Sequence, residues 1–337
     1  MISFMSDYAQ GAHPRMLQAI AAASYEHNEC YLEDVHCVNA AKLIGQRLGK
    51  ECFVTFMPTG TAANLAVIGH FLKPHQAVIS ADSGHISTNE TGAIEATGHK
   101  VIACPSENGK LTVETIKKAL ADHWHVPYVV QPKMVYISQP TELSTLYSKA
   151  ELTAISKLCR EKSLYLYVDG ARLGMALAAM QDELTLADLA ELTDGFTIGG
   201  TKNGALFGEA VVIANLLLAE DFLFSVRQRG AMFARSSTLG IQFEEFFKDN
   251  LYVELGDHAN RMAKLLKEGM VRSGFTLYPE PETNQLFVNL DNKLIERLSK
   301  DFTILIWQGG EATSLVRLTT SWATTEEDVR LFLAALA

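Results

Sequence analysis

Apolar runs and amphipathic segments alternate over roughly the first two thirds of the chain. The runs are short and nearly continuous in Val, Ile, Phe and Tyr, which is typical of buried strands. Between several of them, apolar residues recur at helical spacing. The alternation predicts an α/β fold in which helices flank a doubly wound, mostly parallel sheet. The predicted strands are 52–56, 77–80, 99–104, 134–139, 164–169, 196–199 and 206–213, and the predicted helices are 38–48, 65–72, 113–120 and 149–162.

The pattern changes at about residue 245. Segments 251–273 and 326–335 are then helical, and 286–290 and 315–319 are extended. A chain of 337 residues also exceeds the size at which a single core usually divides. We therefore predict a large domain at 1–245, which begins with an N-terminal arm outside the main sheet, and a smaller C-terminal α+β domain at 246–337.

One lysine stands at the end of a predicted strand. The segment 196–204 is a short apolar strand that runs into small residues, with Lys202 at the turn. Small neighbours leave room for a bulky aldehyde to reach the lysine nitrogen and form a Schiff base, as in enzymes that use pyridoxal phosphate (PLP). The competing interpretation is a solvated lysine in an ordinary turn. The short connection that follows predicts that strand 206–213 is antiparallel to its neighbour.

A carboxylate ends another buried strand. Asp169 closes the run 164–169, and Arg172 follows three positions later. Ligands of open α/β sheets bind at the carboxyl ends of the strands, and a PLP enzyme needs a carboxylate there to keep the pyridine nitrogen protonated. A helix N-cap is the alternative for Asp169, and the presence of Lys202 favours the cofactor role.

A third segment, 57–64, has the composition of an anion-binding turn between a strand and a helix. The free N–H groups of the first helical turn, near Gly60, and the Thr61 hydroxyl can hold a phosphate. It is not a Walker loop, because no Gly-Lys-Ser/Thr follows, and a single glycine cannot supply the dinucleotide fingerprint.

A histidine follows the strand 77–80. His85 is thereby directed toward the same edge of the sheet as the residues above. A flat imidazole can stack on a pyridine ring and also reach a substrate hydroxyl, whereas the competing role is a cap on the following helix. We assign His85 to the site.

These segments, in this order, resemble the threonine aldolase and β-eliminating lyase family of PLP enzymes, and most closely its low-specificity L-threonine aldolase or phenylserine aldolase subgroup. The likeness covers most of the chain. It implies fold type I, the aspartate aminotransferase-like fold, with PLP as the cofactor. The matching positions are 5–7, 60–64, 84–85, 139–143, 168–172, 199–204, Arg317 and 321–322.

The resemblance also implies roles for single residues. It places Ser6 near the substrate carboxylate and makes Tyr31 a residue of the substrate pocket, although Leu32 departs from the usual Tyr-Gly-Asp-Asp turn. Many members have a histidine near the substrate's β-hydroxyl where this chain has Glu142. The general base is therefore open between His85 and Glu142.

Four positions add charged groups or an amide to the implied site. Arg172 and Arg317 would bind charged groups, with Arg317 on the substrate carboxylate, and Asn64 belongs to the cofactor segment. An arginine near Arg235 reaches a cofactor phosphate in relatives, sometimes across a subunit interface, although Arg235 lies slightly off that position. We thus expect a homodimer or homotetramer with the site near an interface.

Charge and cysteine content exclude several other classes. The net charge is −10 and no Lys- or Arg-rich block occurs, so nucleic acid is not expected as a partner. The five cysteines are scattered and lack paired metal spacing, which indicates reduced thiols and no metal. No apolar run reaches the length of about 18 residues that a membrane helix needs, and no signal peptide is evident. We expect a cytoplasmic protein.

The predicted function is a PLP-dependent aldolase that cleaves L-3-hydroxy-α-amino acids, such as threonine, allo-threonine or phenylserine, to glycine and an aldehyde. A β-eliminating lyase or an aminotransferase would use the same Lys202, Asp169 and arginines. A PLP scaffold without activity is a further alternative. A nicotinamide oxidoreductase is disfavoured by the missing glycine fingerprint.

Overall fold

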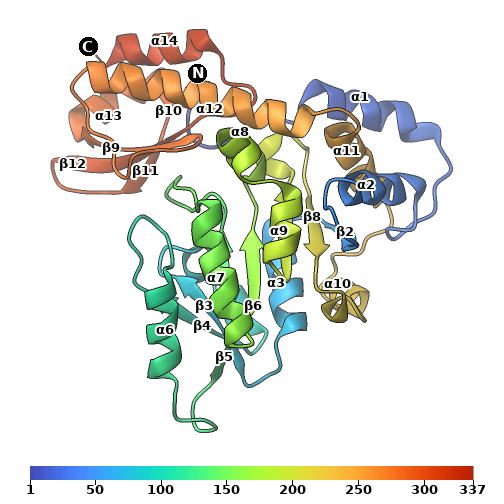
Figure 1. The fold of residues 1–337 in the computed structure, drawn as a ribbon. Coiled ribbons are helices and arrows are strands. Elements are labelled where there is room, and N and C mark those ends of the chain that lie inside the picture. Colours follow the sequence, from blue (N-terminus) through green and yellow to red (C-terminus); the bar gives the residue numbers. More distant parts are fainter. Residues whose placement is uncertain (337) are drawn as a thin grey trace.

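A seven-stranded sheet forms the centre of the molecule in the computed structural model, which describes residues 1–336 (Figure 1). Its strand order is β2-β8-β7-β6-β5-β3-β4. The pairs within β4-β3-β5-β6-β7 are parallel, and β8 is antiparallel to both β7 and β2, as predicted. The strands are β2 (Phe53–Met57), β3 (Gln76–Ala81), β4 (Lys100–Cys104), β5 (Gln131–Ser138), β6 (Tyr165–Asp169), β7 (Gly195–Gly199) and β8 (Glu209–Ile213).

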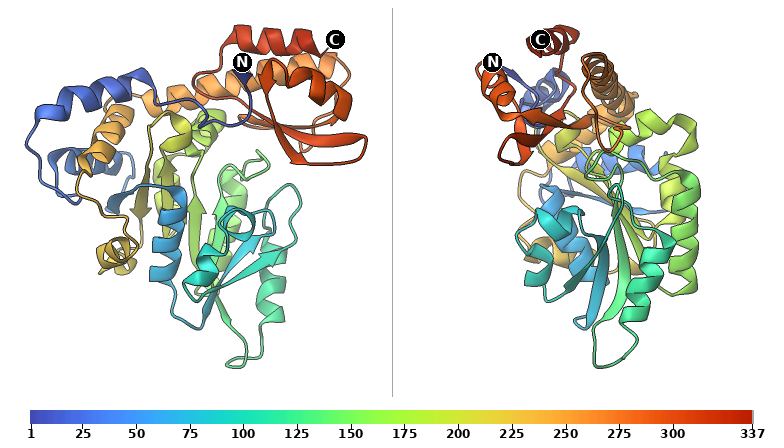
Figure 2. Two further views of the ribbon diagram at one scale, coloured as in Figure 1. Left: turned by 180° about the vertical axis from the view of Figure 1, so that it is seen from behind. Right: turned by 90° about the vertical axis from the view of Figure 1, so that its left-hand side faces the viewer.

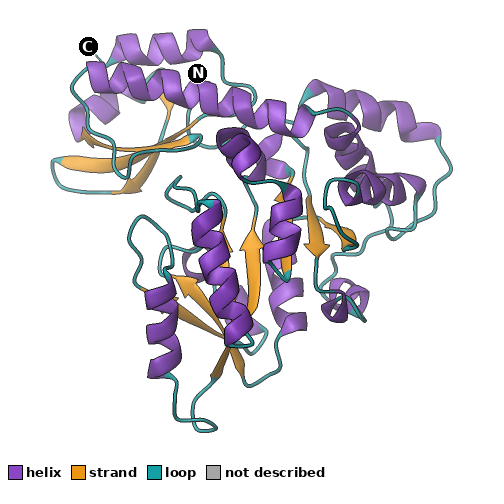
Figure 3. Cartoon of the chain, in the orientation of Figure 1, coloured by secondary structure: helices purple, strands orange, loops and turns teal. Residues whose placement is uncertain are grey.

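Helices cover both faces of this sheet (Figures 1 and 3). Side chains alternate between the faces along each strand, so Ile79 belongs to one apolar core and Val78 to the other. The first core includes side chains of α2, α6, α7, α8, α9 and α11, and the second includes side chains of α3, α5 and α10. The helices are α1 (Pro14–Ala22), α2 (Val35–Gly45), α3 (Gly60–Phe71), α4 (His85–Thr88), α5 (Ala93–Ala96), α6 (Val113–Asp122), α7 (Lys149–Glu161), α8 (Leu173–Met180), α9 (Leu186–Leu192), α10 (Phe222–Gln228) and α11 (Ser237–Lys248).

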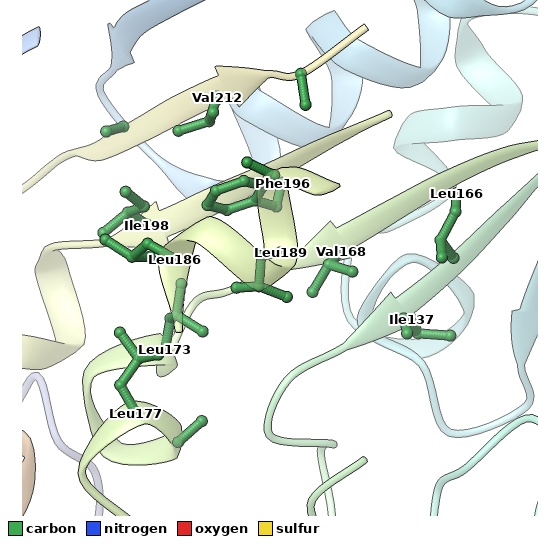
Figure 4. Packing of buried hydrophobic residues seen from close by; sticks show 14 of the residues in the cluster. Ile137, Leu166, Val168, Leu173, Leu177, Leu186, Leu189, Phe196, Ile198 and Val212 are labelled. Carbon is green, nitrogen blue, oxygen red and sulfur yellow. The ribbon is translucent and has the colours of Figure 1, made fainter. Parts of the chain in front are cut away.

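The strands that carry the predicted site rest on the first core. Figure 4 shows apolar side chains of β6, β7 and β8 packed against those of α8 and α9. Val168 lies directly before the last residue of β6, and Phe196 is the second residue of β7. Both side chains are fully buried. This packing fixes the two strand ends from which the polar residues project.

Local capping sets several helix boundaries. The Asp34 side chain accepts a hydrogen bond from the Cys37 N–H, so α2 begins at residue 35, earlier than the spacing of its apolar residues predicts. Thr59 caps α3 in the same way through Ala62 N–H. Helix α7 begins with a capping box between Ser148 and Glu151.

The remaining elements lie together beside one end of the main sheet (Figure 2). A three-stranded sheet has the order β11-β12-β9 and is antiparallel. Strand β1 pairs in parallel with β10, so the N-terminal arm lies outside the main sheet, as predicted. The elements are β1 (Ile2–Ser3), α12 (Leu251–Arg272), β9 (Gln285–Asp291), α13 (Asn292–Leu298), β10 (Phe302–Thr303), β11 (Leu305–Gln308), β12 (Thr313–Thr319) and α14 (Glu326–Ala335).

A third apolar core joins α12, α14 and one face of this smaller sheet. Helix α12 also packs on α8, and this contact joins the part of the chain around the smaller sheet to the part around the main sheet (Figure 1). The division predicted at 245/246 falls within α11 and stays a prediction. Within residues 1–336, no helix is long and apolar enough to cross a membrane.

Candidate active site

The ends of β6 and β7 bring Asp169 and Lys202 to the same edge of the main sheet. Two glycines allow this close approach. A Cβ at Gly170 would lie 2.0 Å from the Thr197 carbonyl oxygen, and one at Gly199 would lie 2.2 Å from the Ala171 carbonyl oxygen. Any larger residue at either position would force the strand ends apart.

Asp169 is a buried carboxylate whose two oxygens both accept hydrogen bonds. Its Oδ2 accepts from Tyr136 Oη at 2.6 Å and from Asn64 Nδ2 at 3.0 Å. Its Oδ1 accepts from the Ala171 N–H at 2.9 Å. Helix α8 begins only at Leu173, so Asp169 is not its N-cap.

Charge around Asp169 keeps it ionised. Burial raises the pKa of this carboxyl, but the charge of His85 and the hydrogen bond from Tyr136 lower it, and the pKa lies below its ordinary value. An ionised, buried carboxylate at this position can pair with a protonated pyridine nitrogen.

Asn64 and Glu90 connect Asp169 to His85. Asn64 Nδ2 donates to Glu90 Oε1 at 2.7 Å as well as to Asp169, and its Oδ1 accepts from Tyr167 Oη at 3.0 Å. Glu90 Oε1 also bonds His85 Nδ1 at 2.7 Å, and the Glu90 side chain is fully buried. Asp169, Asn64, Tyr167, Glu90 and His85 thereby form one hydrogen-bonded network at this edge of the sheet.

His85 is held in one orientation by that network. It is the first residue of α4, after the cap residue Gly84, so it is not itself a helix cap. Burial lowers the pKa of the imidazole, but the hydrogen bond to Glu90 and the charge of Glu142 raise it above its ordinary value. With Nδ1 bonded to Glu90, Nε2 is the nitrogen that can exchange a proton with a substrate.

Lys202 lies in a short 3₁₀ turn, Thr201–Asn203, directly after β7. Burial acts to raise the pKa values of Asp7, Asp169 and Glu209, and the positive charge of Lys202 acts against this effect at each of them, so three acids lie near the lysine. Gly204, the residue that follows this turn, has φ +101°, and a Cβ there would approach Trp322 Cδ1 at 3.3 Å. A larger residue at position 204 would therefore be crowded directly after the lysine turn.

The segment predicted to bind an anion forms the N-terminus of α3. Thr59 is its N-cap, and the N–H groups of Gly60 and Thr61 stand in the first turn, where a helix has no internal acceptors. A Cβ at Gly60 would meet no atom within 4 Å, so there is space beside this turn. Because Asn64 is on the same helix, one element can hold a phosphate and also contact Asp169.

Arg172 forms a buried ion pair with Asp7 of the N-terminal arm. Arg172 Nε donates to Asp7 Oδ2 at 2.6 Å and Nη2 donates to Oδ1 at 3.1 Å. Asn284 Nδ2 also donates to Asp7 Oδ2, at 2.9 Å. Burial raises the pKa of Asp7, but Arg172 lowers it below its ordinary value. Ser6, next to Asp7, is buried as well.

Arg317 faces the same region from β12. Its guanidinium carbon lies 5.0 Å from the centroid of the Trp307 ring, and its Nε is buried without a hydrogen-bond partner within residues 1–336. Burial and the positive charge of Arg172 both lower the pKa of Arg317. Two neighbouring guanidinium groups, one of them incompletely satisfied, are suited to an anionic ligand.

Glu142 lies in the loop after β5. Ser138 Oγ donates to Glu142 Oε1 at 3.3 Å, and Gln139 holds the loop through two hydrogen bonds to the main chain of Tyr147. The Glu142 charge raises the pKa values of both His85 and Arg172, so it faces the same space. Its place supports either role left open by the sequence.

Two predicted site residues lie elsewhere in this single chain. Tyr31 is 43% exposed and its ring lies 4.8 Å from the Arg227 guanidinium carbon. Arg235 is exposed in the turn before α11. Among the described residues, neither forms a hydrogen bond, ion pair or cation–π contact with Lys202 or Asp169. Within those residues, no cluster of acidic, His and Cys side chains could hold a metal ion.

Comparison with known proteins identifies the family. The family model of β-eliminating lyases matches residues 3–301. The low-specificity L-threonine aldolase of Pseudomonas aeruginosa is 33% identical over 333 residues, which cover 97% of this chain and 94% of the relative. The chain belongs to the β-eliminating lyase family. It is accordingly a PLP-dependent lyase, as the resemblance implied.

Solved structures agree with this family and its fold. A threonine aldolase structure from Leishmania major superimposes with a TM-score of 0.97 at 45% identity and covers 100% of this chain and 98% of that one. A Thermus thermophilus aspartate aminotransferase superimposes with a TM-score of 0.74 at 15% identity, covering 100% of this chain and 91% of that one. The predicted fold type I architecture is confirmed.

Proposed function

We propose that this member of the β-eliminating lyase family cleaves L-3-hydroxy-α-amino acids of the threonine type to glycine and an aldehyde. The observation that carries the proposal is the convergence of Lys202, the ionised Asp169 and the incompletely satisfied Arg317 on one region. A lysine, a carboxylate and a cation match the aldehyde, the ring nitrogen and the substrate carboxylate that the reaction requires.

The residues present fit PLP. Lys202 Nζ would hold the aldehyde carbon, the first turn of α3 at Gly60 and Thr61 would hold the phosphate, and Asp169 would hold the ring nitrogen. The His85 ring would lie against the pyridine. When bound, the cofactor accepts the electron pair of the breaking Cα–Cβ bond.

The arginines would orient the substrate. Arg317 is our candidate for the main carboxylate ligand, because its Nε is buried without a hydrogen-bond partner among residues 1–336. Arg172 is fixed by Asp7, so it offers its remaining N–H groups from a defined position. Ser6 adds a hydroxyl beside this pair. Holding the carboxylate in this way would direct the β-hydroxyl toward His85 and Glu142.

Proton removal from the β-hydroxyl is the step that the acid–base residues must supply. We propose His85 Nε2 as the acceptor, because Glu90 orients the ring through Nδ1 and raises the pKa of the imidazole, which makes it a stronger base. Glu142 is the alternative acceptor, or it positions the hydroxyl for His85.

We also propose that the protein acts in the cytoplasm as a homodimer or homotetramer. The exposed Tyr31 and Arg235 would then complete the site of a second subunit. The five cysteines are free, in agreement with a reducing compartment. Light scattering would give the oligomer size. Recovery of activity on mixing Lys202→Ala and Arg235→Ala subunits would support a shared site, and full activity of Arg235→Ala alone would contradict it.

The product analysis is the decisive test of function. The purified protein is supplied with PLP and, separately, with L-threonine, L-allo-threonine and phenylserine. We expect glycine together with acetaldehyde or benzaldehyde in equal amounts. Ammonia with a keto acid would indicate β-elimination, and an amino group transferred to an added keto acid would indicate transamination. The absence of any turnover by PLP-loaded protein would favour a scaffold.

A further inference from the structure

Glu209 is an acid in the interior of the main sheet that the reaction described above does not use. It is the first residue of β8, which lies between β2 and β7. Its neighbours in the register are Gly199 at the end of β7 and Met57 at the end of β2. The residue is only 5% exposed. Glu209 thus lies between the strand that leads to Lys202 and the strand that leads to the anion-binding turn.

The Glu209 side chain is bonded to the two residues that precede Lys202. Its Oε2 accepts from the Gly200 N–H at 3.1 Å, and its Oε1 lies 2.9 Å from Thr201 Oγ1. Thr201 Oγ1 in turn accepts from the Gly208 N–H at 3.0 Å. These bonds fix the backbone from which the lysine projects.

Four ionisable groups face Glu209. The charge of Lys202 lowers the pKa of Glu209 and that of Asp169 raises it. Burial raises the pKa values of the Tyr167 and Tyr252 phenols, and the charge of Glu209 raises them further. Burial raises the pKa of Glu209 to about 8, against the lowering effects of Thr201 and Lys202. The carboxyl is therefore largely neutral near pH 7, unlike Asp169 beside it.

The proton on Glu209 determines the direction of one hydrogen bond. A neutral Glu209 can donate its O–H to Thr201 Oγ1, which has a second lone pair free beside the one used by Gly208 N–H. The Thr201 proton is then available to another acceptor. An ionised Glu209 can only accept, so the Thr201 hydroxyl must turn toward it.

We propose that Glu209 is a positioning residue for Lys202, which holds the lysine turn through its contacts with the Gly200 N–H and the Thr201 hydroxyl. An ionised Glu209 could not donate to Thr201 Oγ1, so its ionisation would rearrange the hydrogen bonds of the turn from which the lysine projects. This inference rests on the proposed function in one respect only, namely that Lys202 carries PLP.

The first experiment needs no cofactor. Thermal stability of the apoprotein is measured from about pH 6 to about pH 9 for wild type and Glu209→Gln. The folded-state pKa of Glu209 lies above its unfolded value, so its contribution to stability is lost as pH rises through the folded pKa. Glutamine keeps the hydrogen bonds of the neutral acid without titrating. We expect the stability of Glu209→Gln relative to wild type to increase with pH.

Asp194→Asn is the matched control. Asp194 lies just before β7, at the opposite edge of the same sheet, and likewise accepts from a main-chain N–H and from a side chain, Leu166 N and Asn215 Nδ2, both at 2.8 Å. Its replacement should not produce the same dependence on pH. Parallel pH profiles for wild type and Glu209→Gln would overturn the inference.

The second experiment measures PLP binding at the same pH values by absorbance, with borohydride labelling to locate the attachment. Between about pH 7 and about pH 9, the dissociation constant of wild type for PLP should rise by up to about tenfold relative to that of Glu209→Gln. Glu209→Ala should bind weakly throughout, because it lacks both hydrogen bonds. Equal pH dependence in wild type and Glu209→Gln would contradict the inference. Labelling of another lysine would refute the proposed function instead, and leaves the apoprotein experiment as the test of Glu209.

Discussion

The two sides of the site differ in how completely they are assembled within one chain. The lysine side comprises Lys202, Asp169, His85, Asn64 and Glu90, contributed by the end of β6, the turn after β7, helices α3 and α4 and the loop after α4. The arginine side comprises Ser6, Asp7, Arg172, Arg317 and Trp307, contributed by the arm, the start of α8 and the smaller sheet.

The two sides differ in the hydrogen bonds of their charged groups. Both oxygens of Asp169 are satisfied, by three donors. Within residues 1–336, Arg317 instead has a buried nitrogen without a hydrogen-bond partner, beside a second arginine. On the lysine side a buried atom without a partner is an acceptor, Glu90 Oε2, whereas on the arginine side it is a donor, Arg317 Nε. A donor on a guanidinium group suits an anionic ligand, so the two sides differ in the charge of the group that they can receive.

The largest effect should follow from Lys202→Ala on the lysine side. Turnover should fall below detection, because no other amine is proposed to hold the cofactor aldehyde. A turn lysine contributes little to folding, so the melting temperature should change little. Lys149→Ala, at a lysine whose side chain is 51% exposed, is the control and should retain activity. Residual turnover comparable with that of the control would remove Lys202 from its role.

Asp7→Asn tests the arginine side for stability. Removing one partner of a buried ion pair leaves Arg172 uncompensated and should cost about 3–5 kcal/mol of unfolding free energy. Asp257→Asn breaks an exposed pair with Arg261 and should cost less than about 1 kcal/mol. Denaturant titrations measure both. Equal costs would show that the Asp7 pair does not stabilise the fold.

Substitutions at His85 and Glu142 locate the general base on the lysine side. Loss of a general base typically lowers the rate by about 10²–10⁴-fold. We expect that loss in kcat for His85→Asn and a milder one for Glu142→Gln. The reverse order would assign the base to Glu142. Retained activity in His85→Phe would instead mean that the ring only stacks on the cofactor, and wild-type kcat in all three variants would exclude both bases.

Arg317→Ala separates binding from folding. Loss of a charged ligand for the substrate carboxylate should lower kcat/KM by about 10²-fold. The stability loss should be far smaller than for Asp7→Asn, because Arg317 forms no ion pair within residues 1–336 and its removal leaves no charged partner uncompensated. Arg330→Ala, at a residue whose side chain is 68% exposed, is the control for kinetics. An unchanged kcat/KM would move the carboxylate site elsewhere.

The smallest effect concerns Glu90→Gln. A base must be neutral to accept a proton, so kcat/KM should rise with pH through the pKa of His85. Glu90 raises that pKa, and the glutamine variant should therefore shift the acidic limb of the profile to lower pH. Glu95→Gln, at an exposed residue of α5, should leave the limb in place. A shift to higher pH would contradict the proposed network.

Local sequence signals predicted that Asp169 and Lys202 stand at strand ends, and the structure has them there. Asp169 and Lys202 each follow an apolar run, and a run of that kind can be read without knowing its neighbours. The same holds for Gly60 and Thr61, which stand where a strand gives way to a helix. The fold followed from the alternation of those runs.

Partners that meet across long separations were not predicted. Asp7 lies 165 positions from Arg172, and Asn64 lies 26 positions from Glu90. In the sequence, Glu209 is a single acid at the edge of an apolar strand, and nothing in the pattern predicts its hydrogen bonds to Gly200 and Thr201. Only Glu90 had a usable signal, since it follows His85 by little more than one helical turn. Strand β11, which carries Trp307, is short and largely exposed, so its apolar pattern is weak.

The N-terminal arm is attached to both parts of the molecule. Asp7 forms an ion pair with Arg172 at the start of α8, and Ile2 and Ser3 pair with β10 beside the smaller sheet. Proteolytic trimming of this arm would release both attachments at once. Preparations with a nicked arm, or with a bulky fusion directly before Ile2, should therefore bind substrate poorly while still holding the cofactor.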